Sequence, residues 1–116
     1  MVWREFRRET RAPLGAEGAA RLEVVDAAGT RFPAGDAIPL RNALSIGRGP
    51  GNDLIVDEDT VSGRHALVVQ RDGRWWIDDL QSRNGTQVNA SEVVGSRQLK
   101  PGDIIQIGRV SLRFSR

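Results

Sequence analysis

From residue 21 onward, apolar and polar residues alternate in several short runs. In "VSLRF" at 110–114, valine, leucine and phenylalanine alternate with serine and arginine, and "RLEVVD" at 21–26 and "ALSIG" at 43–47 follow the same pattern. Successive side chains of a strand point to opposite faces of its sheet, so this period of two predicts half-buried β-strands. Thirteen glycines and five prolines are also more than a helical bundle of this size tolerates.

A hairpin signal lies between two of these runs. Asp72-Gly73 separates "ALVVQR" from "RWWID", and Asp-Gly favours the type I′ turn that matches the twist of paired strands. By alternation Trp75 faces the core beside Ile77; the alternative is that Trp75 and Trp76 form a platform on which a peptide stacks. About ten short strands without a convincing helix predict an all-β sandwich or barrel, in which the loops at one end are free to carry function.

The first twenty residues differ in composition from the rest of the chain. Their first half is arginine-rich around Trp3 and Phe6, and their second half consists mainly of alanine and glycine. We therefore expect a basic lead-in and flexible linker over 1–20, followed by a single domain over 21–116. The alternative for the lead-in is a basic juxtamembrane segment whose membrane anchor precedes residue 1.

The residue types argue against several function classes. The chain has no cysteine and one histidine, His65, so we expect no disulfide, no metal site, no cofactor and a cytoplasmic location. No run reaches the roughly 18 apolar residues of a membrane span. No activated nucleophile or paired carboxylates can be assembled, so we do not expect an enzyme. We expect "DEDT" at 57–60 to be an exposed acidic loop, because it lacks the spacing of a calcium-binding loop.

The charge balance bears on the partner. Seventeen basic residues are interspersed with fifteen acidic ones, which gives a net charge of +2. A nucleic-acid-binding domain usually concentrates much more positive charge on one face, so we expect no nucleic-acid partner. Nucleic-acid binding through the arginines is kept as a further alternative, which a steep salt dependence would indicate.

Four short motifs lie in turns between the strand-like runs: "IGRG" at 46–49, "SGRH" at 62–65, "SRNGT" at 82–86 and "VN" at 88–89. In this order and spacing they resemble the forkhead-associated (FHA) domain of bacterial signalling proteins. That family shows a Gly-Arg pair at a strand end, then Ser-x-x-His, then Asn-Gly-Thr followed by an asparagine. The resemblance covers roughly residues 21–116 and implies a two-sheet β-sandwich of about ten to eleven short, mostly antiparallel strands.

The resemblance also implies a function and a set of site residues. An FHA domain binds phosphothreonine peptides, so the expected partners are a Thr-phosphorylated protein and an upstream Ser/Thr kinase. Arg48 matches the arginine that contacts the phosphate, Ser62 the serine that donates to it, and Asn84 the asparagine that bonds the peptide main chain. The further phosphopeptide-binding candidates are Gly63, Arg64 and Arg83, and the loop-structural candidates are Gly47, His65, Gly85, Thr86 and Asn89.

The chemistry of the motif residues agrees with this implication. A phosphothreonine carries close to two negative charges, and the planar fork of an arginine suits phosphate better than a lysine does. Ser62 adds a hydroxyl donor, and tight turns expose backbone N–H groups. We expect His65 to brace the loop that presents Ser62, because a metal site or a catalytic base would need partners that the sequence lacks.

Three positions depart from the family pattern. Gly63 stands where the family often has arginine or asparagine, and Arg83 stands where many relatives have a small residue such as threonine. Asn89 is followed by Ala90 where the family often has glycine. The departures at Gly63 and Arg83 motivate an alternative, a degenerate FHA domain that makes phospho-independent protein contacts. Arg48→Ala would separate the two hypotheses.

Overall fold

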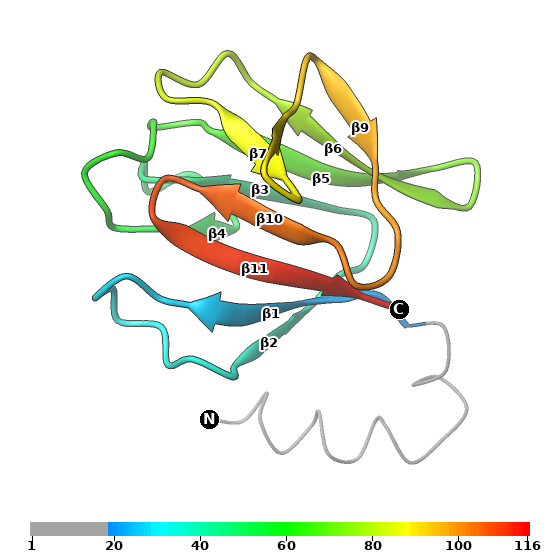
Figure 1. Ribbon diagram of the computed structural model, residues 1–116, viewed down its shortest axis with the longest axis horizontal. Helices are drawn as coiled ribbons and strands as arrows, with labels where there is room; N and C mark the ends of the chain where they lie inside the picture. Colours follow the sequence, from blue (N-terminus) through cyan, green and yellow to red (C-terminus); the bar gives the residue numbers. More distant parts are fainter. Residues whose placement is uncertain (1–18) are drawn as a thin grey trace.

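The structure is a computed structural model that describes residues 19–116, and these form two packed β-sheets (Figure 1). The predicted lead-in lies outside the described residues over 1–18. Ala20 is buried, and its carbonyl accepts a hydrogen bond from the Leu40 amide at 2.9 Å. The packed part of the chain thus includes the residue immediately before the boundary predicted at Arg21.

Eleven strands are present among the described residues. The larger sheet contains six of them, in the order β2 (Ala37–Pro39), β1 (Arg21–Asp26), β11 (Val110–Ser115), β10 (Ile104–Ile107), β7 (Thr86–Val88) and β8 (Ser91–Glu92). The smaller sheet contains five, in the order β4 (Leu54–Ile55), β3 (Ala43–Gly47), β5 (Ala66–Arg71), β6 (Arg74–Asp79) and β9 (Ser96–Gln98). Strands β3 and β4 pair in parallel, and the other described pairings are antiparallel. The predicted β-sandwich is confirmed.

The core lies between the two sheets and follows the predicted alternation. Along β11, Val110, Leu112 and Phe114 are each 1% exposed, whereas the residues between them face outward. Trp75 on β6 is also buried, and its ring packs at a tilt against Phe114 with centroids 6.4 Å apart. Trp75 is therefore a core residue, and its large apolar surface helps hold the two sheets together.

The tight turn between β5 and β6 and the longer loops lie at opposite ends of the sandwich (Figure 1). Asp72 and Gly73 both have positive φ, 54° and 75°, and join β5 to β6 with Arg71 paired to Arg74, as a type I′ turn requires. This tight hairpin lies at one end of the smaller sheet. The loops that follow β3, β4 and β6 gather at the opposite end (Figure 1). Among residues 19–116, no helix is long and apolar enough to cross a membrane.

Candidate functional site

A polar pocket lies between the loops that follow β3, β4 and β6. Its lining comprises Arg48, Asp59, Thr60, Val61, Ser62, Gly63, Arg83 and Asn84. Five of the six predicted phosphopeptide-binding residues are in this set. The sixth, Arg64, is exposed and is not part of the lining. Residues from three separate loops thus meet around one pocket.

The ring of His65 connects two of these loops. It is fully buried at 0% exposed, and its Nδ1 accepts a hydrogen bond from the Ser62 amide at 3.0 Å. Because Nδ1 accepts, Nε2 carries the proton, and it donates to the Gly85 carbonyl at 2.9 Å. The backbone amide of His65 also bonds the Ile46 carbonyl in β3 at 2.9 Å. The imidazole therefore joins the loop that carries Ser62 (residues 56–65, the serine loop) to the loop that carries Asn84 (residues 80–85, the asparagine loop).

The loop that carries Arg48 (residues 48–53, the arginine loop) packs against the serine loop through close backbone contact. The amides of Arg48 and Gly49 donate to the carbonyls of Ser62 and Gly63 at 2.9 and 3.0 Å. A Cβ on Gly47 would lie 2.3 Å from the Gly63 carbonyl oxygen, far inside van der Waals contact. The glycine before Arg48 is therefore needed because two backbones meet there, and this contact places the guanidinium beside Ser62.

Asn52 is a residue of this site that sequence reasoning missed. Its Nδ2 donates to the Gly49 carbonyl at 2.8 Å and to the Gly63 carbonyl at 2.6 Å, so it joins the arginine loop to the serine loop a second time. The available signal was its place in the turn "GPGND", because asparagine side chains commonly bond nearby backbone in such turns.

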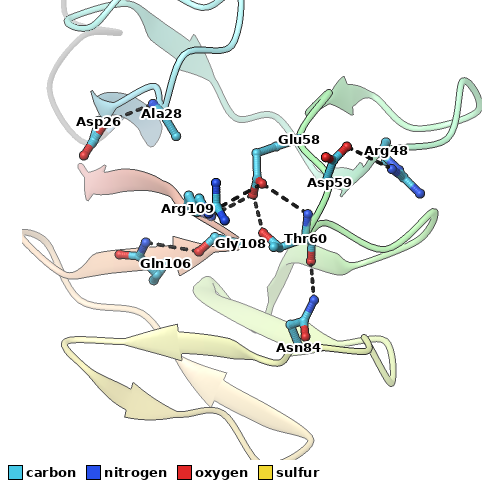
Figure 2. Close-up of polar contacts among 10 residues, drawn as sticks. All are labelled: Asp26, Ala28, Arg48, Glu58, Asp59, Thr60, Asn84, Gln106, Gly108 and Arg109. Atoms are coloured by element: carbon cyan, nitrogen blue, oxygen red, sulfur yellow. Dashed lines mark hydrogen bonds and ion pairs between the residues drawn. The ribbon is translucent and has the colours of Figure 1, made fainter.

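The serine and asparagine side chains are held by neighbouring loops. The Ser62 hydroxyl accepts a hydrogen bond from the Arg83 amide at 2.8 Å. A hydroxyl that accepts one hydrogen bond still has its own hydrogen to donate. The Asn84 side-chain amide donates to the Thr60 carbonyl at 2.9 Å (Figure 2). Neighbouring loops thus position both polar groups, while the side chains of Arg83 and Asn84 remain exposed.

A small hydrogen-bond network around Asp79 shapes the asparagine loop. Asp79, at the end of β6, accepts hydrogen bonds from the Ser82 hydroxyl at 2.6 Å and from the buried Thr86 hydroxyl at 2.8 Å. The Ser82 oxygen in turn accepts from the Gly85 amide at 3.0 Å. Gly85 has a φ of +86°, in the left-handed region that favours glycine. Thr86 and Gly85 thus fix the turn that carries Asn84.

Partial burial alone would raise the pKa of Asp79. The hydrogen bonds from Ser82 and Thr86 outweigh that effect, so the pKa of Asp79 lies below its usual value. Its carboxylate remains ionised at neutral pH, as an acceptor of these bonds requires.

The expectation that residues 57–60 form a uniformly exposed acidic loop is wrong for Glu58. This side chain is buried at 8% exposed and accepts hydrogen bonds from the Arg109 amide at 2.9 Å and the Thr60 amide at 3.1 Å. It also accepts one from the Thr60 hydroxyl (Figure 2). That hydroxyl bond is the largest contribution that holds the pKa of Glu58 below its usual value, and burial acts in the opposite direction. Three donors compensate the cost of burying this charge.

Asn89 has a structural role away from the pocket. Its side chain donates to Asp103 at 2.9 Å and accepts from the Ile104 amide at 3.0 Å. Its φ is +52°, which asparagine tolerates better than most residues. These bonds attach the turn between β7 and β8 to the start of β10, so Asn89 supports the strand that begins at Thr86.

The pocket is suited to an anion. Arg48 and Arg83 bring two positive charges to it, and Asp59 brings one negative charge, with its Oδ1 3.7 Å from the Arg48 guanidinium. Within residues 19–116, no group of three or more histidine, aspartate or glutamate side chains could hold a metal ion. The arrangement can bind a charged group and hydrogen-bond its surroundings.

Gly47→Ala tests the close approach of the arginine and serine loops. The added methyl group must push the Gly63 backbone away, so we expect the variant to lose about 1–3 kcal/mol of unfolding free energy in urea titrations. Gly51→Ala is the matched control, because nothing lies within 4 Å of a Cβ there. Equal stability of the two variants would contradict the account of this contact.

Asp79 makes the stability of the domain dependent on pH. Its pKa is lower in the folded protein than in the unfolded chain, so its contribution is present at neutral pH and is lost as the pH falls below about 4. We expect the stability difference between the native protein and Asp79→Asn to shrink between pH 7 and pH 3 in urea unfolding. Asp57→Asn, on an exposed loop residue, is the control; a difference that is constant with pH would contradict this role.

The sequence and the fold were compared with those of known proteins. The family model of the FHA domain matches residues 44–108. The chain is 42% identical over 74 residues to an oxoglutarate dehydrogenase inhibitor of Corynebacterium diphtheriae, covering 64% of this chain and 51% of that protein. It is 41% identical over 87 residues to the glycogen accumulation regulator GarA of Mycobacterium tuberculosis H37Rv, covering 75% of this chain and 50% of that protein. The chain therefore spans about half the length of these relatives.

Solved structures share the fold. EmbR of Mycobacterium tuberculosis, in complex with a low-affinity phosphopeptide, superposes with a TM-score of 0.76 at 28% identity, over 98% of this chain and 29% of EmbR. A structure from a study of phosphothreonine-dependent FHA domain interactions gives a TM-score of 0.72 at 28% identity, over 84% of this chain and 96% of the other. The match of the family model to more than half of the chain, together with this fold, shows that the protein belongs to the FHA domain family.

Proposed function

We propose that this FHA domain binds phosphothreonine peptides in the pocket around Arg48 and acts as an adaptor in Ser/Thr kinase signalling. The observation that carries the proposal is the meeting of Arg48, Ser62 and Asn84 at one pocket from three loops. Similar folds are described with a phosphopeptide bound and in phosphothreonine-dependent interactions. The partner would then be a protein phosphorylated on threonine by a Ser/Thr kinase.

Each group has a role in this binding. The guanidinium of Arg48 would pair with the phosphate, the Ser62 hydroxyl would donate to it, and Asn84 would hydrogen-bond the peptide main chain beside the phosphothreonine. Hydrogen bonds to charged groups contribute roughly 1.5–3 kcal/mol each, so one or two of them make binding depend on the phosphate by about tenfold to about twenty-thousandfold. Removal of the phosphate would release the peptide.

Two of the departures from the family pattern, Gly63 and Arg83, line the pocket. Nothing lies within 4 Å of a Cβ built on Gly63, so a methyl group would fit at this position without displacing a neighbour. Arg83 is exposed at the rim of the pocket and adds positive charge there. Arg64 is exposed outside the pocket lining, so we assign it no direct contact with the phosphate.

Arg48→Ala tests the proposed function. We expect the native domain to bind a degenerate phosphothreonine peptide library in preference to matching phosphoserine and unphosphorylated libraries, measured by fluorescence anisotropy. Loss of the arginine should weaken phosphothreonine binding at least tenfold, because a charge-assisted contact with the phosphate is removed. Arg74→Ala is the control, since Arg74 is exposed at the opposite end of the smaller sheet.

Two results would contradict the proposal. Equal binding of the phosphorylated and unphosphorylated libraries would show that the domain makes phospho-independent contacts. Selective binding that persists in Arg48→Ala would place the phosphate site elsewhere on the domain.

A further inference from the structure

The pocket that suits an anion also contains one carboxylate. Among residues 19–116, Asp59 is the only acidic residue of its lining, and its Oδ1 lies 3.7 Å from Nη1 of Arg48 (Figure 2). The Asp59 side chain is fully exposed, whereas that of Arg48 is about half-exposed at 48%. A phosphate that binds Arg48 must therefore share this arginine with Asp59 or displace it.

The backbone around Asp59 holds this charge at the rim of the pocket. Asp59 and Thr60 are the central residues of a tight turn, closed by a hydrogen bond from the Val61 amide to the Glu58 carbonyl at 3.0 Å. Glu58, the residue before Asp59, is held in place by its own buried carboxylate, which accepts a hydrogen bond from the Arg109 amide at 2.9 Å.

The residue after Asp59 is fixed as well. The Thr60 amide and hydroxyl both donate to Glu58, and the Thr60 carbonyl accepts from Asn84 at 2.9 Å (Figure 2). The Asp59 side chain can rotate, but its backbone cannot leave the pocket unless these bonds break. Asp59 is thus a permanent feature of the site.

The charges of the pocket do not balance when a phosphate is bound. Arg48 and Arg83 supply two positive charges against the one negative charge of Asp59. A phosphothreonine adds close to two negative charges, which leaves an excess of about one negative charge. An exposed ion pair contributes little, so the phosphate can take Arg48. The carboxylate of Asp59 then lies beside the phosphate without its cation.

We propose that this site selects phosphothreonine peptides that carry an arginine or lysine close to the phosphothreonine, whose positive charge pairs with Asp59. The inference rests on the proposed function and specifies its ligand class. It runs against the overall charge of the chain, because a net charge of +2 would favour acidic peptides. A preference for basic peptides therefore requires a local cause.

Binding of phosphothreonine peptides with a varied neighbour tests this selection. A library-derived binding peptide would carry arginine, alanine or glutamate at one position at a time, within three residues on either side of the phosphothreonine. At low ionic strength and for at least one position, we expect the arginine peptide to bind the native domain about fivefold more tightly than the glutamate peptide. The ratio should shrink at 0.5 M salt, where exposed charges are screened.

Variants of Asp59 test whether its carboxylate causes the difference in affinity between the arginine and glutamate peptides. In Asp59→Asn the arginine and glutamate peptides should bind within about twofold of each other, and the alanine peptide should bind more tightly than to the native domain. In Asp59→Lys the preference should reverse. Asp57→Asn removes the same charge from an exposed residue that does not line the pocket, and it should keep the native ratio.

The possible failures can be told apart. If phosphothreonine peptides bind selectively and Asp59→Asn keeps the native ratio, the assignment to Asp59 is overturned while the phosphothreonine site stands. The same holds if Asp57→Asn abolishes the ratio as strongly as Asp59→Asn. If no phosphorylated peptide binds selectively, both the proposed function and this inference are overturned.

Discussion

The two hydrogen bonds of the buried His65 ring hold together two of the loops that surround the pocket. One nitrogen accepts from the Ser62 amide and the other donates to the Gly85 carbonyl, which lies 20 residues after His65 in the sequence, so a single planar group sets the spacing of two loops. A hydrophobic residue of similar size would leave a partly buried amide and a partly buried carbonyl without these partners, which costs stability. The lone histidine is thereby explained without metal or catalytic chemistry.

The rest of the pocket is fixed by close backbone contact and by buried polar groups. The absence of a side chain at Gly47 lets the arginine loop approach the serine loop, and Asn52 adds a hydrogen bond to the Gly63 carbonyl at the same contact. Glu58 and Asp79 are carboxylates that organise the two neighbouring turns by accepting several hydrogen bonds each. A site preorganised in this way spends little binding free energy on ordering its loops, so more of it goes into affinity.

Much of this architecture follows from local sequence rules, and the remainder depends on contacts that those rules do not include. The period-two runs and the Asp72-Gly73 turn report strand faces and a hairpin directly, because side-chain direction and turn geometry are local properties. The burial of Glu58 could not be predicted, because its donor at Arg109 lies 51 residues away along the chain. The same holds for the contact between Asn52 and Gly63. The sequence also does not indicate that Asp59 lines the pocket and that Arg64 does not, because both depend on how the loops are placed relative to one another.

If the loops held together by His65 form the phosphate site, a nuclear magnetic resonance titration will locate a bound phosphopeptide at these loops. A phosphothreonine peptide would be added to the ¹⁵N-labelled domain while the backbone amide shifts are followed. We expect the largest changes at 48–49, 59–63 and 83–85, with little change at the Asp72-Gly73 hairpin, and no such effect from the unphosphorylated peptide. Changes centred on the hairpin or on the outer face of a sheet, or equal changes with both peptides, would contradict this expectation.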